Sequence, residues 1–164
     1  MTFCTDMIVE IPRNSNIKYE FDKDINMMRC DRIISTSMLY PGNYGYIPNT
    51  LSGDGDPLDI LLICDYGIYP GVIVNVKVIG VLETCDEKGD DEKLIAVPSY
   101  HVDKNYNNIN SLDTLGDFYK NKIKHFFEHY KDNEDSKWVT VKEFGGTDRA
   151  LDIYNESKKR ASMN

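Results

Sequence analysis

The sequence has few of the features that mark nucleotide-binding, membrane-spanning or zinc-binding proteins. Its 164 residues contain no GxxxxGKS/T loop and no GxGxxG run, so neither common glycine-rich phosphate cradle is present. No apolar run approaches the ~20 residues of a membrane span, and Met1 to Asp6 lacks the basic flank and apolar stretch of a secretion signal. The four cysteines show no CxxC spacing, which indicates a reduced, cytoplasmic protein without a zinc or redox motif.

Positive charge is also scarce, which limits the partners that we expect. The chain has 19 Lys and Arg against 27 Asp and Glu, a net charge of −8. Nucleic acid and anionic membranes attract basic surfaces, so neither is expected as a partner. An apolar content of 41% and eleven tyrosines indicate a folded globular protein, and the length predicts a single domain over residues 1–164.

Three acidic residues occur in the six-residue stretch Asp54-Gly55-Asp56-Pro57-Leu58-Asp59. Three carboxylates in six residues repel one another, and hard divalent cations, which prefer oxygen ligands, would offset that repulsion. A calcium loop of the EF-hand type is excluded, because Leu58 and Asp59 occupy the positions where an acid or amide and then a glycine are required. A solvated acidic turn remains the alternative, since Asp, Gly and Pro are ordinary turn residues.

The apolar pattern predicts a mainly β protein with some helix, an α+β chain. Tyr40–Tyr46 is rich in Gly and Pro and is interpreted as an ordered aromatic loop. From Ser111 to Tyr130 apolar residues recur at three- and four-residue steps, which predicts one long amphipathic helix capped by Asn110 or Ser111. A short terminal helix, capped by Thr147, is expected through Tyr154. Strands are expected over Met7–Pro12, Ile17–Phe21, Met27–Ile34, Leu58–Cys64, Val72–Glu83, Leu94–Val97 and Trp138–Phe144. Short consecutive strands separated by turns suggest a small closed barrel.

Several polar features allow two interpretations. Lys18 and Glu20 occupy the polar face of an alternating strand, which by itself indicates solvent exposure. The cluster Asp86–Lys93 resembles a solvated hairpin tip. His125 and His129 lie one helical turn apart, but without a third ligand, packing or subunit contact is favoured over a metal pair. Carboxylates can hold Mg²⁺, and Lys, Arg and Tyr side chains can bind phosphate oxygens. The combination makes a metal-dependent phosphoryl hydrolase possible.

Seven separated motifs together give a more specific indication. The acidic stretch resembles the DGDPxD signature of the family I soluble inorganic pyrophosphatases. Six further motifs resemble motifs of the same family, occur in the same order and have nearly the same spacings. The other motifs are Glu10-Ile11-Pro12, Lys18-Tyr19-Glu20, Asp31-Arg32, Tyr40-Pro41-Gly42-Asn43-Tyr44-Gly45, Asp86-x-x-Gly89-x-Asp91-x-Lys93 and His125-Phe126-Phe127-Glu128-His129-Tyr130-Lys131. The likeness extends over about Met7 to Val141 and is greatest to the short bacterial type.

The resemblance implies a five-stranded OB-like barrel with one long and one short helix packed outside. It also implies Mg²⁺-dependent hydrolysis of pyrophosphate, with several Mg²⁺ ions per site and Mn²⁺ or Zn²⁺ as possible substitutes. Asp56 would be the general base for a water bridging two metals, with Glu20 and Tyr40 in support. The implied metal ligands are Asp54, Asp59, Asp86, Asp91 and Glu10, and the implied phosphate contacts are Lys18, Arg32, Tyr44, Lys93, Tyr130 and Lys131.

The resemblance further implies a homo-hexamer in which His125 and His129 lie near subunit contacts. The chain departs from the family pattern at the Met27–Cys30 entry to Asp31 and beyond Val141, which affects terminal packing and oligomer contacts more than chemistry. The alternative is a non-catalytic OB-like module that binds divalent cations or polyphosphate. The complete set of catalytic residue types argues against it, because a decayed site should have lost some of them.

Overall fold

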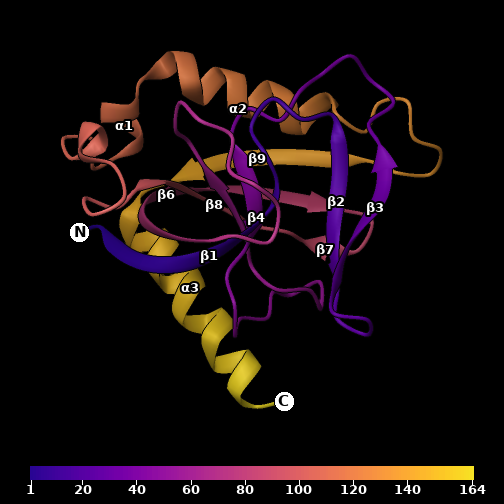
Figure 1. Cartoon of the computed structure of the whole chain (residues 1–164), viewed down its shortest axis with the longest axis horizontal. Helices are drawn as coiled ribbons and strands as arrows, with labels where there is room; N and C mark the ends of the chain where they lie inside the picture. Colours follow the sequence, from indigo (N-terminus) through magenta and orange to yellow (C-terminus); the bar gives the residue numbers. More distant parts are fainter.

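The computed structural model describes residues 1–164 and is built on a closed ring of five strands (Figure 1). The ring runs β1-β4-β5-β8-β6 and closes through pairing of β6 with β1; every pairing is antiparallel except β5 with β8. The predicted five-stranded barrel is therefore confirmed. Its strands are β1 (Phe3–Ile11), β4 (Asn43–Tyr46), β5 (Asp59–Leu62), β6 (Ile73–Asp86) and β8 (Lys93–Pro98).

The longest strand, β6, extends beyond the barrel. Its first half pairs with β1 and β8, and its second half pairs with β9 (Val139–Gly145) and the two-residue β7 (Gly89–Asp90). The hairpin turn between β6 and β7 is the acidic cluster that the sequence placed at a hairpin tip. Because β6 is anchored in the barrel wall, this turn is held at a defined place on the rim.

A separate two-stranded sheet stands beside the barrel, visible at the right of Figure 1. It consists of β2 (Ile17–Asp22) and β3 (Met27–Ile33). Asn26 in the connecting turn has a φ of 55°, a left-handed conformation that Asn tolerates better than most residues. This hairpin forms one wall of the pocket described below.

The barrel interior is filled by one cluster of 31 buried apolar residues. Ile60, Leu61 and Leu62 of β5 are completely buried, as is most of β8 beside it. A parallel pair that is buried on both faces is expected to be continuously apolar, and these two strands are apolar after their first residues, Asp59 and Lys93. They give a rigid support to the acidic stretch that immediately precedes β5.

The predicted long helix is divided in two. Ser111 caps α1 (Leu112–Leu115) through a capping box with Thr114, as the sequence allowed. Gly116 then interrupts the helix with a φ of 100°, and α2 (Asp117–His129) follows. In the first turn of α2, Phe118 is 74% exposed although the periodicity placed it on the apolar face, whereas Tyr119 beside it packs against the core.

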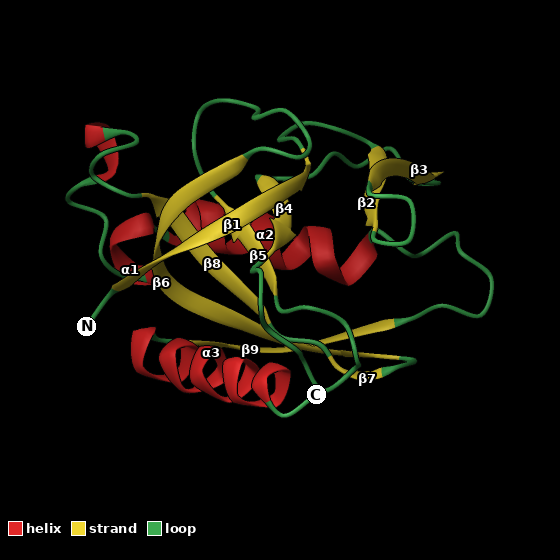
Figure 2. Ribbon diagram, turned by 60° about the horizontal axis from the view of Figure 1, so that its bottom comes forward, coloured by secondary structure: helices red, strands yellow, loops and turns green.

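The C-terminal helix α3 (Thr147–Ser162) has 16 residues, longer than α2, so the expected short helix was wrong in length. Thr147 does not cap it: Gly146 is the cap residue, without a side-chain bond, and the Thr147 hydroxyl instead accepts a hydrogen bond from the amino group of Met1 at 3.1 Å. In Figure 2 the helix lies along β9 beneath the barrel. Near its end, the buried Ser157 accepts the Leu51 backbone N–H at 3.0 Å, which braces the loop before the acidic stretch.

Part of the expected aromatic loop is a barrel strand. Residues Asn43–Tyr46 form β4, between β1 and β5. A Cβ on Gly45 would lie 1.9 Å from the Ile8 carbonyl oxygen, so glycine is required for β1 and β4 to approach. A residue that weakens an isolated strand is here a condition of barrel closure. A 3₁₀ turn at Lys104–Tyr106 lies in the connection between β8 and α1. No helix of this structure has the length and apolar content of a membrane-spanning segment.

Gly45→Ala should lower the free energy of unfolding by about 3 kcal/mol, the upper end of overpacking effects, because β1 and β4 must separate to admit the methyl group. Urea unfolding followed by circular dichroism measures this. Gly67→Ala is the control, since its nearest neighbour would be the Arg13 carbonyl oxygen at an ordinary 3.5 Å. Equal stability of the two variants would contradict the role assigned to Gly45.

Candidate active site

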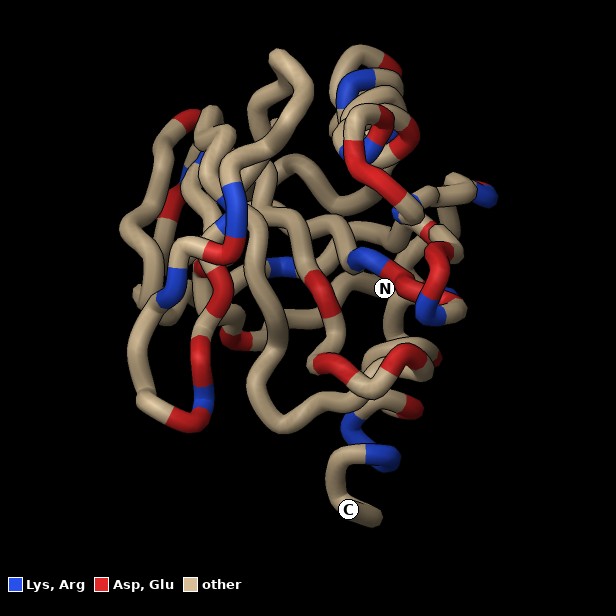
Figure 3. Tube along the Cα trace, turned by 90° about the vertical axis from the view of Figure 1, so that its right-hand side faces the viewer, with Lys and Arg blue, Asp and Glu red and all other residues tan.

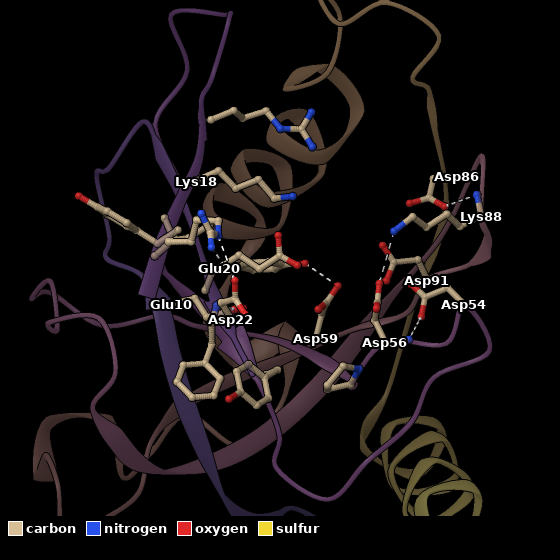
Figure 4. A pocket seen from close by; sticks show the side chains of 18 of the residues that line it. Glu10, Lys18, Glu20, Asp22, Asp54, Asp56, Asp59, Asp86, Lys88 and Asp91 are labelled. Carbon is tan, nitrogen blue, oxygen red and sulfur yellow. Dashed lines mark hydrogen bonds and ion pairs between the residues drawn. The ribbon is translucent and has the colours of Figure 1, made fainter. Parts of the chain in front are cut away.

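A pocket of about 600 Å³ opens between the β2–β3 hairpin, the loop before β5, the β6–β7 turn and the end of α2 (Figure 4). Every residue that the sequence assigned to the site lines it except Lys93, which lies buried between the Asp59 and Asp91 carboxylates. Lys18 and Glu20 line this pocket. Glu20 is exposed, as its strand face predicted, and Lys18 is half-buried, so this face is open to solvent at the pocket rather than on an outer surface. The hairpin tip at Asp86 likewise belongs to the pocket.

The pocket has two chemically different sides. In Figure 4, Asp54, Asp56, Asp86 and Asp91 lie together on one side, Lys18, Glu10 and Glu20 lie on the other, and Asp59 lies between. Figure 3 views the molecule from the β2–β3 side and shows that both charge signs occur along the segments on this side of the chain. We call one group of side chains the acidic wall: Asp54, Asp56, Asp59, Asp86 and Asp91. We call a second group the basic wall: Lys18, Arg32, Tyr130 and Lys131.

Lys93 is the buried cation beneath the acidic wall. Its Nζ lies 2.9 Å from Asp91 Oδ2 and 3.1 Å from Asp59 Oδ2, and it donates to the Tyr44 hydroxyl at 2.7 Å. Tyr44 in turn donates to Asp59 Oδ2 at 2.7 Å. The ammonium also lies 5.1 Å from the ring centre of Phe127, within cation–π range, and its side chain is 2% exposed. These contacts fix the two carboxylates relative to each other.

One lysine does not balance two buried carboxylates. Burial raises the pKa of Asp59 to about 8, although Lys93 opposes the rise. At Asp91 burial also works upward, but the contacts with Lys93 and Asp59 and the charge of Lys131 together outweigh it and the pKa is lowered. One ammonium group faces two carboxylates, so the ionised pair calls for additional positive charge. A divalent cation would supply that charge.

The turn that carries Asp54 and Asp56 is held by its own backbone. Asp54 Oδ1 accepts the Asp56 N–H at 3.0 Å, and the Asp56 carbonyl accepts the Ser52 N–H at 2.7 Å. Burial raises the pKa of Asp54. The Asp56 side chain is 62% exposed and therefore open to water in the pocket, with Lys88 Nζ 3.6 Å from its carboxylate.

The basic wall is organised by ion pairs and buried phenols. Asp31 Oδ2 lies 3.3 Å from Lys18 Nζ and 3.1 Å from Arg32 Nε, which brings these two cations together. Lys131 Nζ lies 3.5 Å from Asp86 and joins the two walls. Burial raises the pKa of Tyr130 to about 12, so its hydroxyl stays protonated and can donate to an anion.

Glu10 links the barrel to the β2–β3 hairpin. Its carboxylate accepts the Phe21 N–H at 2.9 Å. Burial raises the pKa of Glu10 to about 7, with the Phe21 hydrogen bond acting against that rise and Glu20 adding to it. Tyr40 is buried against Phe126 and Tyr44, with ring centres 4.6 and 5.4 Å away, and so supports the pocket floor.

The pocket also contains residues that sequence reasoning missed. Glu87 and Lys88 belong to the acidic cluster already singled out, so their nearness to Asp86 in the chain is the signal that could have found them. No pattern distinguishes Lys137 from other surface lysines. The missed lining residues with charge are Asp22, Lys23, Asp24, Arg29, Glu87, Lys88 and Lys137.

The histidine pair does not line this pocket. The rings of His125 and His129 lie 4.8 Å apart on the exposed face of α2, and His129 Nδ1 lies 2.8 Å from Asp132 Oδ2. No three His, Cys, Asp or Glu side chains converge closely enough in this structure to enclose a metal. In the acidic wall, Lys93 is the group toward which Asp59 and Asp91 point.

Carboxylates that face cations and phenols across one pocket, on a five-stranded barrel, have the chemistry of an enzyme site for a phosphate-containing anion. The sequence profile of the inorganic pyrophosphatases matches residues 7–162, and the chain belongs to that family. The inorganic pyrophosphatase of Sulfolobus acidocaldarius is 46% identical over 157 residues (96% of this chain, 91% of the relative), and that of Rickettsia conorii is 47% identical over 158 (96% and 91%). Among solved structures, the inorganic pyrophosphatase from Helicobacter pylori superposes on this chain with a TM-score of 0.94 and is 41% identical in sequence. The superposition covers 98% of this chain and 94% of the Helicobacter pylori chain.

Lys93→Met should lower the free energy of unfolding, measured in urea without metal, by about 3–5 kcal/mol, because Asp59 and Asp91 lose their buried partner. Adding Asp59→Asn should recover part of the loss by removing one unpaired carboxylate. Lys142→Met, which removes an exposed lysine paired with Asp90, is the control and should change stability little. Wild-type stability of Lys93→Met would contradict the counter-ion role.

Proposed function

We propose that this chain hydrolyses inorganic pyrophosphate to two phosphates in a Mg²⁺-dependent reaction, with Asp56 as the general base. The observation that carries the proposal is the opposition of an acidic and a basic wall across one pocket. Metal ions suit the first wall and phosphate oxygens the second. Membership of the inorganic pyrophosphatase family supports the same substrate.

The acidic wall fits Mg²⁺ by its chemistry, since its donors are carboxylate oxygens and their charge exceeds that of Lys93. Asp54, Asp59 and Asp91 would hold a first ion and Asp59 also a second. Asp86 and Asp91 would hold an ion that arrives with substrate, and Glu10 a further one through water. Mn²⁺ or Zn²⁺ would be possible substitutes. When bound, such ions make water more acidic and offset negative charge on phosphate.

The basic wall binds and orients the anion. Lys18 and Arg32, held together by Asp31, present cations on one strand pair, and Lys131 and the Tyr130 hydroxyl donate from the end of α2. Tyr44 and Lys93 would contribute at the junction of the two walls. Charge on the departing phosphate is what phosphoryl transfer must stabilise, and these donors are pre-positioned for it.

Asp56 accepts the proton of the attacking water. Its carboxylate is exposed to the pocket, while its backbone is fixed by Asp54 and Ser52, so it can face water without moving the turn. Glu20 and Tyr40 act as positioning residues around the substrate. A fixed base near an oriented anion favours in-line attack.

We further propose that residues 1–164 form one domain, that the protein is cytoplasmic, and that it assembles as a homo-hexamer. The single buried cluster supports one domain, and the free cysteines support a reducing compartment. His125 and His129 are exposed on α2 and available for subunit contacts. Sedimentation of a stable monomer at micromolar concentration would contradict the hexamer.

The direct test is phosphate release from pyrophosphate by purified protein with Mg²⁺, with EDTA, and with Mg²⁺ plus fluoride. We expect release that needs Mg²⁺ and is inhibited by fluoride. Folded protein that binds Mg²⁺ but releases no phosphate would instead support the non-catalytic alternative, a barrel that only binds cations or polyphosphate. The complete set of Asp56, Lys18, Arg32 and Tyr130 around one pocket favours catalysis.

Asp56→Asn should reduce turnover about 100- to 10,000-fold, the usual contribution of a general base, while Mg²⁺ binding is largely kept. The amide occupies the same space but cannot accept the proton. Steady-state kinetics with direct Mg²⁺ titration separates the two effects. Full activity of this variant would exclude Asp56 as the base.

Asp59→Ala should weaken Mg²⁺ binding, whereas Asp56→Asn should leave Mg²⁺ binding largely unchanged. We expect the Mg²⁺ affinity to fall about 10-fold or more, since even groups that only contact metal ligands are worth about 10–100-fold. Equilibrium titration of the protein with Mg²⁺ measures it. An unchanged Mg²⁺ requirement would remove Asp59 from the metal ligands.

A further inference from the structure

Four cations that line the pocket belong to neither wall, and one of them, Lys88, contacts the acidic wall. Lys88, on the β6–β7 turn, places its Nζ 3.6 Å from Asp56 Oδ2, across the mouth of the acidic wall (Figure 4). Its backbone N–H donates to Asp86 Oδ1 at 2.9 Å. Lys88 is therefore connected to two carboxylates, from segments 30 residues apart in the chain.

The backbone of Lys88 is held in place from several directions. Asp86 and Gly89 are paired across the hairpin, and Gly89 has a φ of 123°, which closes the turn tightly. Beside it, Glu87 accepts the Trp138 N–H at 3.4 Å and lies 3.8 Å from Lys131 Nζ. The turn cannot easily leave the pocket, so only the Lys88 side chain is free to change partners.

The acidic turn has no other counter-ion. Among the ion pairs of the chain, Asp56 is paired only with Lys88 and Asp54 is in none, because Lys93 pairs with Asp59 and Asp91. Both members of the Lys88–Asp56 pair are about 62–63% exposed, so the pair contributes little to stability. Its effect should therefore be found in what else can bind there.

We propose that Lys88 is an internal counter-ion that competes with divalent metal for the acidic wall and so raises the metal concentration at which the pocket loads. The inference depends on the proposed metal site. A cation entering beside Asp54 and Asp56 meets the charge of the Lys88 ammonium and must displace it from Asp56. Since the turn is fixed, the displaced ammonium remains nearby and continues to repel the metal.

The test is titration of the metal-free protein with Mg²⁺ alone, by calorimetry and by competition with Mn²⁺ detected by electron paramagnetic resonance. Lys88→Gln should lower the Mg²⁺ dissociation constant about three- to tenfold, as expected for removing one nearby positive charge at a solvated site. Lys88→Arg should keep the wild-type value because it keeps the charge. The difference between wild type and Lys88→Gln should shrink in 1 M salt, where the screening length is about 3 Å.

Lys142→Gln is the matched control. It removes the same charge from an exposed lysine on neighbouring β9, which pairs with Asp90 and does not line the pocket. Wild-type Mg²⁺ affinity in this variant supports the inference. Equal affinity of Lys88→Gln and wild type, or an equal gain in Lys142→Gln, would overturn it. Absence of Mg²⁺ binding by the wild-type protein would instead overturn the proposed metal site, and this inference with it.

Discussion

The structure of the pocket depends on the burial of the Lys93 ammonium against Asp59 and Asp91. A charge can remain at 2% exposure only if it is paired and hydrogen-bonded, and here two carboxylates and the Tyr44 hydroxyl satisfy it. The same contacts connect three neighbouring strands of the barrel, β4, β5 and β8, so the packing of these strands and the positions of Asp59 and Asp91 are fixed together. Because one positive charge faces two carboxylates, the acidic wall keeps an excess of negative charge that further cations can balance.

The rest of the fold gives each wall an independent support. The acidic stretch stands between the apolar strand β5 and the Leu51–Ser157 hydrogen bond to α3, and the Asp86 turn is the extension of the longest strand, β6. The basic wall comes from a separate hairpin and from the end of α2. The two walls therefore reach the pocket from separate parts of the fold, and Lys131–Asp86 is an ion pair that joins them.

Much of this could be predicted from the sequence, because the main strands and the α+β class follow from local alternation, and the spaced motifs contain most of the residues that line the pocket. Strand β4 could not, since Gly45 disfavours a strand locally and is required only by the approach of Ile8 in β1. The length of α3 was missed because its last inward-facing residue, Ser157, is polar and contributes a carbonyl group rather than apolar contact. Lys88 was missed because its importance comes from Asp56, a residue far from it in sequence.

The central claim is that the acidic wall holds metal and the basic wall holds phosphate. A crystal structure with Mn²⁺ and a non-hydrolysable pyrophosphate analogue tests it most directly, since anomalous scattering locates Mn²⁺ without reference to the protein. The account predicts Mn²⁺ peaks among Asp54, Asp59 and Asp91, with the analogue's oxygens on Lys18, Arg32 and Tyr130. Mn²⁺ bound only elsewhere, or an analogue that avoids these three donors, would contradict it.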